Sequence, residues 1–144
     1  MESGWLLPDL EDEDAAPFWA GTARGELLVQ ACADCGYRRM PPRPMCFACR
    51  ALRHTWAPVS GRGHIWSFVV VHPPLLPAYG ALAPYNVVTV SLEEDARLRL
   101  VGNLVARADG AINEVDPRTI RIGDPVRVVF QPVDDVVLPR WVRA

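Results

Sequence analysis

Four cysteines have the type and spacing of a metal site, and they are the only cysteines in the chain. Cys32 and Cys35 form one Cys-x-x-Cys pair, and ten residues separate it from a second pair formed by Cys46 and Cys49. Each pair can deliver two thiolates from one tight turn, and four thiolates complete the tetrahedron that zinc prefers. Gly36 follows the first pair and suits the sharp turn required there. The spacing therefore predicts one structural zinc ion in a zinc ribbon.

The alternatives for these cysteines are two disulfides or a redox-active dithiol. No signal-peptide pattern precedes them, so we expect a reducing cytoplasmic environment in which disulfides do not persist. No strand–helix–strand pattern surrounds either pair, which argues against a thioredoxin-like centre. Because four protein ligands leave no open position for water, we expect the zinc to hold structure and not to catalyse a reaction.

Composition excludes several other functions. All 15 basic residues of this 144-residue chain are arginines, so Schiff-base or phosphate-loop chemistry that depends on lysine is impossible. Only four serines occur, and none lies in a Gly-x-Ser-x-Gly motif. The formal net charge of −2 lacks the basic excess typical of nucleic-acid-binding proteins, so nucleic acid is not the expected partner. No apolar run reaches the length of a membrane span, so no membrane association is expected.

The elements that must position the cysteines are short. Residues 1–14 carry an acidic run and are expected to form a solvated tail or a partner-binding arm. Residues 15–23 are predicted to form a helix, with Asp14 as its N-cap and Pro17 in its first turn. A strand should enter the first cysteine pair, a proline-rich extended link should join the pairs, and a strand should leave the second pair, at residues 25–31, 38–44 and 53–59.

The remainder of the chain reads as β structure. Five strands, a long loop at residues 73–84 after the first strand and no long helix predict a small barrel of the OB type. Alternation places Trp66, Phe68 and His72 on one face of the first strand. The strands are expected at residues 64–72, 85–92, 98–106, 126–131 and 136–142. The chain is thus predicted to be mainly β, with a tail and short helix, a zinc ribbon and a five-stranded OB-fold at residues 1–24, 25–60 and 61–144.

Large apolar side chains predict a partner surface. Phe18 and Trp19 lie on a helix that is too short to bury them alone. Trp141 and the proline-rich loop at residues 73–84 add further apolar surface. Together they offer more than a domain of this size hides easily, so we expect part of this surface to contact another protein.

Motifs from about residue 15 onward resemble those of one known family. The matching stretches are Pro17–Trp19, Gly25–Gly36, Pro41–Arg43, Cys46–Cys49, Trp56, Ser60–Gly63, Val71–His72, Pro84–Tyr85, Gly102–Leu104 and Ile122–Val126. In their order and spacing they resemble the family that pairs an N-terminal rubredoxin-like zinc ribbon with an OB-fold, long described as a domain of unknown function. Arg50 is a departure, because this family usually has glycine after the fourth cysteine, and the shape of that turn is therefore in question.

The resemblance implies a function in acyl-CoA metabolism, beside a partner with a thiolase fold such as a thiolase-like lipid-transfer protein. In pairs that resemble steroid side-chain aldolases, the thiolase-like subunit carries the catalytic residues and the OB-fold subunit completes the complex and its acyl-CoA site. The resemblance thus implies a non-catalytic subunit of a carbon–carbon lyase that cleaves a steroid-type side-chain acyl-CoA, in a heterotetramer. The alternatives are a scaffold subunit of a thiolase complex and an OB module that binds single-stranded nucleic acid.

Four residues are candidates for contact with acyl-CoA. Arg38 and Arg43 lie in an arginine cluster around the cysteines, where guanidinium groups can bind CoA phosphates or simply compensate the charge of the thiolates. His72 ends a strand and could contact CoA or act as a base, but a polar cap on the barrel explains it as well. Tyr85 could line an acyl path or pack in the core. No residue of this chain is predicted to be catalytic.

Overall fold

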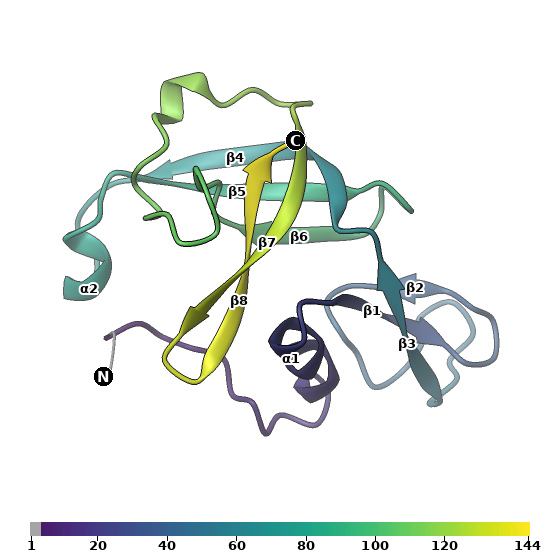
Figure 1. The fold of residues 1–144 in the computed structure, drawn as a ribbon. Coiled ribbons are helices and arrows are strands. Elements are labelled where there is room, and N and C mark those ends of the chain that lie inside the picture. The colour runs from purple at the N-terminus through teal and green to yellow at the C-terminus, as the bar shows by residue number, and fades with distance from the viewer. Residues whose placement is uncertain (1–3) are drawn as a thin grey trace.

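The cysteine-bearing part is a three-stranded antiparallel sheet preceded by a short helix in the computed structural model, which describes residues 4–144 (Figure 1). Its elements are α1 (Ala16–Ala23), β1 (Leu27–Cys32), β2 (Arg38–Arg39) and β3 (His54–Val59). The strand order is β2-β1-β3, and β1 pairs with β3 from Leu27 opposite Val59 to Cys32 opposite His54. The two expected strands are present, and the extended link contributes the short strand β2.

The second part is a nearly closed barrel of five strands. These are β4 (Arg62–Val71), β5 (Tyr85–Leu92), β6 (Arg99–Gly102), β7 (Pro125–Val133) and β8 (Val136–Arg143). They are antiparallel neighbours in the order β6-β5-β4-β7-β8. The loop after β4 holds the short helix α2 (Pro77–Gly80), and a 3-10 turn (Pro117–Thr119) precedes β7. The predicted fold class, a zinc ribbon followed by a five-stranded OB barrel, is confirmed.

Strand β6 ends at Gly102, earlier than the predicted strand 98–106. Side-chain hydrogen bonds close the barrel beyond that point. Asn86 on β5 replaces the missing ladder, because its amide accepts from the Leu104 N–H at 2.6 Å and donates to the Leu104 carbonyl at 2.9 Å. A parallel bridge between Leu104 and Trp141 then joins this segment to β8. A Cβ on Gly102 would lie 3.0 Å from the Trp141 ring, so the glycine lets the indole pack against the strand.

A β-bulge breaks the alternation that was expected along β4. The register with β5 shifts between Ile65 and Ser67, which inserts one residue and rotates the side chains that follow. Trp66 is therefore 50% exposed, with the Arg99 guanidinium 3.8 Å from its ring centroid, whereas Phe68 packs against the core. The prediction that Trp66, Phe68 and His72 share one face is wrong for this reason.

Helix α1 begins at Ala16 with Pro17 in its first turn, as expected, but Asp14 is not its N-cap. Ala15 holds that position and makes no capping hydrogen bond through its side chain. The carbonyl of Asp12 accepts from the N–H groups of Ala15 and Ala16 at 3.0 and 2.7 Å, so backbone atoms satisfy these donors instead.

No helix within residues 4–144 has the length and apolar character needed to cross a membrane.

The helix, the ribbon and the barrel share one hydrophobic core. Helix α1 contacts both β1 and β8. Phe18 from the helix and Val29 from the ribbon join Trp141 from the barrel in a single cluster, and Phe18 and Trp141 are only 7% and 1% exposed. The prediction that Phe18 and Trp141 offer partner surface is therefore wrong, because the two parts of the chain bury them against each other. Trp19 packs partly against the same cluster, and Leu76 in the loop after β4 stays exposed.

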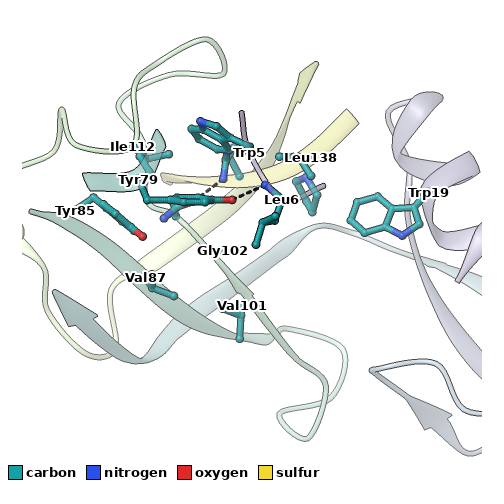
Figure 2. Close-up of a pocket in the computed structure, with 13 residues that line it drawn as sticks. Trp5, Leu6, Trp19, Tyr79, Tyr85, Val87, Val101, Gly102, Ile112 and Leu138 are labelled. Carbon is teal, nitrogen blue, oxygen red and sulfur yellow. Dashed lines mark hydrogen bonds between the residues drawn. The ribbon is translucent and has the colours of Figure 1, made fainter. Parts of the chain in front are cut away.

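The N-terminal segment lies along the barrel, where a solvated tail or arm was expected. Trp5 is half-buried, and its ring centroid lies 5.5 Å from that of Tyr79 in α2 (Figure 2). The Leu6 N–H donates to the Tyr79 hydroxyl at 2.9 Å. Trp5 and Leu6 are thus held by the loop after β4, whereas residues 11–13 of the acidic run are exposed, and residues 1–3 of the expected tail lie outside the described residues.

Candidate functional site

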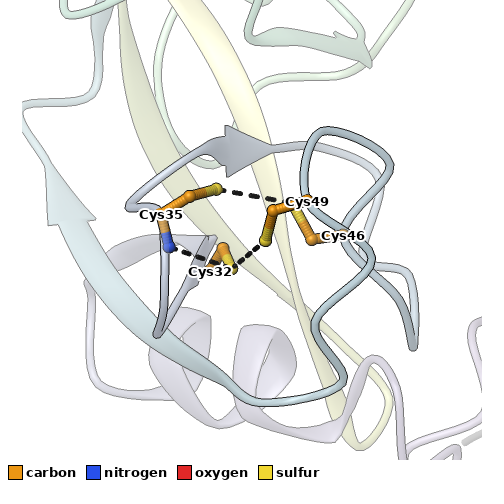
Figure 3. A group of neighbouring side chains, drawn as sticks. All are labelled: Cys32, Cys35, Cys46 and Cys49. Carbon is orange, nitrogen blue, oxygen red and sulfur yellow. Dashed lines mark hydrogen bonds between the residues drawn. The ribbon is translucent and has the colours of Figure 1, made fainter.

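The four cysteine sulfurs converge between two turns of the ribbon (Figure 3). Cys32 ends β1, and its Sγ lies 3.5 Å from that of Cys49, while the Sγ atoms of Cys35 and Cys46 lie 3.7 Å apart. All four sulfurs lie within 4.8 Å of one another. A tetrahedral zinc site with bonds of about 2.3 Å places its sulfurs about 3.8 Å apart. The observed separations therefore fit the predicted ligand set of a tetrahedral metal ion.

Backbone amides shape each turn and stabilise thiolate charge. The Cys35 N–H donates to Cys32 Sγ at 3.4 Å, and this hydrogen bond is the main cause that lowers the pKa of Cys32 to about 6. The N–H of Cys49 likewise lowers the pKa of Cys46. One cysteine of each pair therefore ionises more readily than an ordinary thiol, which favours metal binding as a thiolate.

The other cysteine of each pair resists ionisation when no cation is present. The Ala51 N–H favours the Cys49 thiolate, but the hydrogen bond with Cys32 and burial outweigh it and raise the pKa of Cys49 to about 12. The Tyr37 N–H lowers the pKa of Cys35, but burial and the sulfurs of Cys46 and Cys32 outweigh it, so the pKa is raised. Four thiolates this close repel one another, and a divalent cation removes that repulsion.

Arg50 adopts the turn that the family usually builds with glycine. Its φ is 67°, close to the 76° of Gly36 at the equivalent place in the first turn. The Arg50 N–H donates to the Cys46 carbonyl at 2.7 Å, just as the Gly36 N–H donates to the Cys32 carbonyl at 3.0 Å. Arginine in place of the usual glycine therefore leaves the shape of the turn unchanged, but a non-glycine residue in the left-handed backbone conformation adds strain.

We expect opposite effects on stability from two substitutions at these turns. Gly36→Ala should lower the free energy of unfolding by about 1 kcal/mol, because a Cβ there meets nothing within 4 Å and only the positive φ opposes it. Arg50→Gly should raise it by up to about 1 kcal/mol by relieving the same strain. Denaturant unfolding of the metal-loaded protein measures both, and metal content should not change. Destabilisation by Arg50→Gly would contradict this account.

Arg38 lies beside the cysteines but faces carboxylates. It lines an open hollow of about 720 Å³ together with Cys35, Glu94 and Asp95. Hydrogen bonds from Arg97 are the main cause that lowers the pKa of Asp95 to about 2, and the charge of Arg38 adds to this effect. A CoA phosphate at Arg38 would meet these two acidic groups, so charge compensation accounts for Arg38 better than phosphate contact does.

Arg43 is held by its backbone and leaves its side chain exposed. Its N–H donates to Gln30 Oε1 at 2.8 Å, and its carbonyl accepts from Arg39 Nη2 at 2.9 Å. Gln30 and Arg39 are paired across β1 and β2 and are themselves buried. Arg43 therefore has a fixed backbone and an exposed guanidinium, which is available for a phosphate contact.

His72 and Tyr85 lie away from the two arginines. His72 follows the last residue of β4 and is exposed, while Tyr85 begins β5 and is 9% exposed in a cluster with Val105 and Ile112. Figure 1 places this end of β4 and β5 near α2, on the opposite side of the barrel from the ribbon. The structure therefore does not bring the four candidate residues into one site.

Sequence analysis missed Arg140, which is buried in the barrel. A charged residue between the apolar residues Leu138 and Trp141 in a predicted closing strand was the available signal. The alternation along that strand does not reveal which face is buried, because Trp5, far away in the sequence, packs beside Arg140.

The ribbon with its four sulfurs and the five-stranded barrel together define a zinc-ribbon–OB-fold protein. The family description "ChsH2, rubredoxin-like zinc ribbon domain" matches residues 19–55, and "ChsH2, C-terminal OB-fold domain" matches residues 56–131. The chain belongs to this ChsH2 family, which confirms the resemblance seen in its motifs.

Three relatives match at similar identity. The 3-oxo-4,17-pregnadiene-20-carboxyl-CoA hydratase alpha subunit of Mycobacterium tuberculosis is 34% identical over 136 residues, which cover 94% of this chain and 40% of that protein. A probable enoyl-CoA hydratase alpha subunit of Thermomonospora curvata is 36% identical over 85% of this chain and 35% of its own length. The chain thus spans less than half of either alpha subunit. A DUF35 domain-containing scaffold protein of Methanothermobacter thermautotrophicus is 34% identical over 76% of this chain and 75% of its own length.

Two solved structures share the fold. A chain of the Ltp2-ChsH2(DUF35) aldolase matches with a TM-score of 0.79 and 31% identity, over 94% of this chain and 98% of that chain. A DUF35-family protein of unknown function from Sulfolobus solfataricus matches with a TM-score of 0.61 and 11% identity, over 92% of this chain and 87% of that chain. The second match supports the fold alone.

Proposed function

We propose that this protein is a non-catalytic subunit of an acyl-CoA-processing complex with a thiolase-fold partner, and that the complex is an aldolase. The observation that carries this proposal is the match along 98% of a chain of the Ltp2-ChsH2(DUF35) aldolase. The proposed reaction is retro-aldol cleavage of a steroid-type side-chain acyl-CoA. The name of the Mycobacterium relative supports a steroid-type acyl-CoA as the substrate, and the name of the Thermomonospora relative supports an acyl-CoA more generally.

The proposed cofactor of this chain is one structural zinc ion, bound by Cys32, Cys35, Cys46 and Cys49. Sulfur separations of 3.5 and 3.7 Å support tetrahedral thiolate binding. The ion would link the two cysteine turns, and with them the strands that pack α1 against the barrel. Its role is to hold the ribbon in place, since four sulfurs leave no position for a substrate.

We assign the chemistry to the partner because retro-aldol cleavage needs oriented acid–base groups, and the described residues include no histidine that is ion-paired with a carboxylate. A base must remove the hydroxyl proton, and a donor must stabilise the enolate of the thioester. His64 and His72 are exposed, and no histidine forms an ion pair with a carboxylate of the described residues. Arg43 remains the proposed contact to CoA phosphate, while Arg38, His72 and Tyr85 are weaker candidates on the geometry described above.

A scaffold role in a thiolase complex is the second candidate, and the name of the Methanothermobacter relative favours the scaffold role, without naming its partner. In both cases the chain assembles with a thiolase-fold protein, and the reaction of the partner distinguishes them. Binding of single-stranded nucleic acid is less favoured, because several exposed arginines pair with carboxylates and do not form a free basic groove.

Assembly tests the proposal directly. We expect this chain and the thiolase-like protein encoded beside its gene to co-purify, and light scattering on the peak to give two copies of each. The exposed ribbon residues Phe47 and Leu52, which are 64% and 71% exposed, offer apolar surface for this contact. A thiolase from an unrelated operon is the control partner. If the chain stays unassociated when mixed with its neighbour at micromolar concentration, the proposal fails.

A further inference from the structure

Strand β6 is the last strand in the order of its sheet, and one of its edges is not paired. The Leu92 N–H donates to the Leu98 carbonyl at 2.9 Å, which sets the phase of the ladder between β5 and β6. Hydrogen-bonded pairs alternate along an antiparallel ladder, so Leu100 bonds to β5 while its two neighbours do not. The N–H and carbonyl groups of Arg99 and Val101 therefore point away from β5.

Strand β8 approaches this edge without pairing with it. The Trp141 N–H donates to the Asn103 carbonyl at 3.0 Å, just beyond the end of β6. Beside Val101, β8 presents Pro139, which has no N–H to donate. Apart from the ladder with β5, no backbone hydrogen bond within residues 4–144 reaches Arg99 or Val101. The outward groups of β6 thus form an open strand edge.

An apolar cavity of about 330 Å³ lies along this open edge. Leu100 and Val101 form part of its lining, and most of the rest comes from α1, the ribbon link and β8. These other lining residues are Phe18, Trp19, Met40, Pro41 and Pro139. An extended chain that enters beside β6 can therefore bond to the open edge and place an apolar side chain in the cavity.

The open edge also carries a cation that no carboxylate neutralises. Arg99 is exposed, and its guanidinium lies 3.8 Å from the Trp66 ring centroid. No carboxylate of the described residues forms an ion pair with Arg99. Residues that lie opposite each other on paired strands share a face, so an acidic residue opposite Arg99 would pair with it. An apolar residue opposite Leu100 would point into the cavity for the same reason.

Contacts connect this edge with the exposed ribbon surface. The Arg97 guanidinium, two residues before Arg99, lies 4.9 Å from the Tyr37 ring centroid. The Tyr37 ring in turn packs edge-on against Phe47, with 4.9 Å between the ring centroids. Phe47 belongs to the apolar surface proposed for contact with the partner. A partner that covers Phe47 therefore lies beside the hairpin that leads into β6.

We infer that the thiolase-fold partner adds an extended segment to the five-stranded sheet, along the open edge of β6. Its backbone would bond to Arg99 and Val101, an acidic side chain would pair with Arg99, and an apolar side chain would enter the cavity. In strand addition of this kind, main-chain hydrogen bonds supply affinity and the side chains supply specificity. This inference rests on the proposed function and names the surface through which the complex forms.

Amide hydrogen exchange at single-residue resolution tests the inference, on the chain alone and in complex with the thiolase-like protein encoded beside its gene. In the free chain, the amides of Arg99 and Val101 should exchange faster than that of Leu100, because only Leu100 bonds to β5. In the complex, exchange at Arg99 and Val101 should slow at least about ten-fold.

The possible outcomes separate this inference from the proposed function. A complex in which the amides of Arg99 and Val101 stay unprotected overturns the inference and leaves the proposed function standing. Equal protection of Arg99, Leu100 and Val101 in the free chain also overturns it, because the edge would not be open. If no complex forms, both the proposed function and this inference fail.

Variants of the edge distinguish strand addition from simple burial. Val101→Pro removes an outward N–H without breaking the ladder to β5, and edge strands tolerate proline at such positions. It should raise the dissociation constant of the complex about ten-fold or more, whereas Val101→Thr, which keeps the N–H, should change it less than about three-fold. A folded Val101→Pro protein that assembles as tightly as the wild type overturns the inference.

Charge reversal provides a second test that does not depend on the folding of the proline variant. Arg99→Glu should also raise the dissociation constant at least about ten-fold, because it would repel the acidic residue of the added strand. Arg127→Glu, at an exposed position on β7, is the matched control and should leave assembly unchanged. Equal affinities of these two variants for the partner would contradict the proposed pairing at Arg99.

Discussion

Replacing Cys35 with serine should release the zinc ion and unfold the ribbon. The Cys35 side chain is exposed and makes no core contact, so the loss would come from the metal alone. Structural zinc contributes on the order of 10 kcal/mol to the folding of small metal domains. Because Phe18 and Val29 pack in one cluster with Trp141, the loss should spread into the barrel. Metal analysis and denaturant unfolding measure both effects.

Asp34→Asn is the matched control for this experiment. Asp34 lies in the same turn and pairs with Arg53, but it is not a ligand, and both side chains of the pair are largely exposed. Its loss should therefore lower the free energy of unfolding by less than about 1 kcal/mol and leave one zinc per chain. A zinc-free or iron-containing wild-type protein, or a Cys35→Ser protein that keeps its zinc and its stability, would reject the assignment.

The purified chain should show no aldolase, thiolase or hydrolase turnover, whereas the complex with its thiolase-like partner should cleave or form a carbon–carbon bond in an acyl-CoA. The chain has no lysine, and its only four cysteines form the metal cluster. Its three histidines make no ion pair with a carboxylate of residues 4–144. No histidine of the described residues is therefore oriented by a carboxylate as a general base, and this is why we expect no turnover from the chain alone.

Two variants of the complex separate binding from chemistry. Arg43→Ala should raise KM about ten-fold with little change in kcat, because a phosphate contact stabilises the ground and transition states alike. His72→Ala should lower kcat by no more than about three-fold, since its side chain is exposed beyond the end of β4. Arg127→Ala, an exposed arginine on β7, is the control for charge. A loss of several orders of magnitude in kcat for His72→Ala, with assembly intact, would move the catalytic base onto this chain.

The sequence by itself determined the features that depend on neighbours along the chain. The spacing of Cys32, Cys35, Cys46 and Cys49 specified two turns with paired sulfurs, because each turn is closed by hydrogen bonds within a few residues. Strand β5 was predicted with its observed bounds, since its apolar residues alternate and turn residues flank it. The order of such elements was sufficient for the class of fold.

Only the tertiary structure decided which side chains are buried and which residues meet. Phe18 and Trp141 were expected to be exposed, but the ribbon and the barrel cover them mutually. Arg43 and His72 were grouped by chemistry, yet Arg43 lies in the ribbon between β2 and β3, whereas His72 follows the last residue of β4 in the barrel. Arg140 is buried although it is charged, and Trp5, far away in the sequence, packs beside its guanidinium. Burial, charge compensation and the shape of a cavity arise from contacts between distant segments, and a pattern along the chain does not encode these contacts locally.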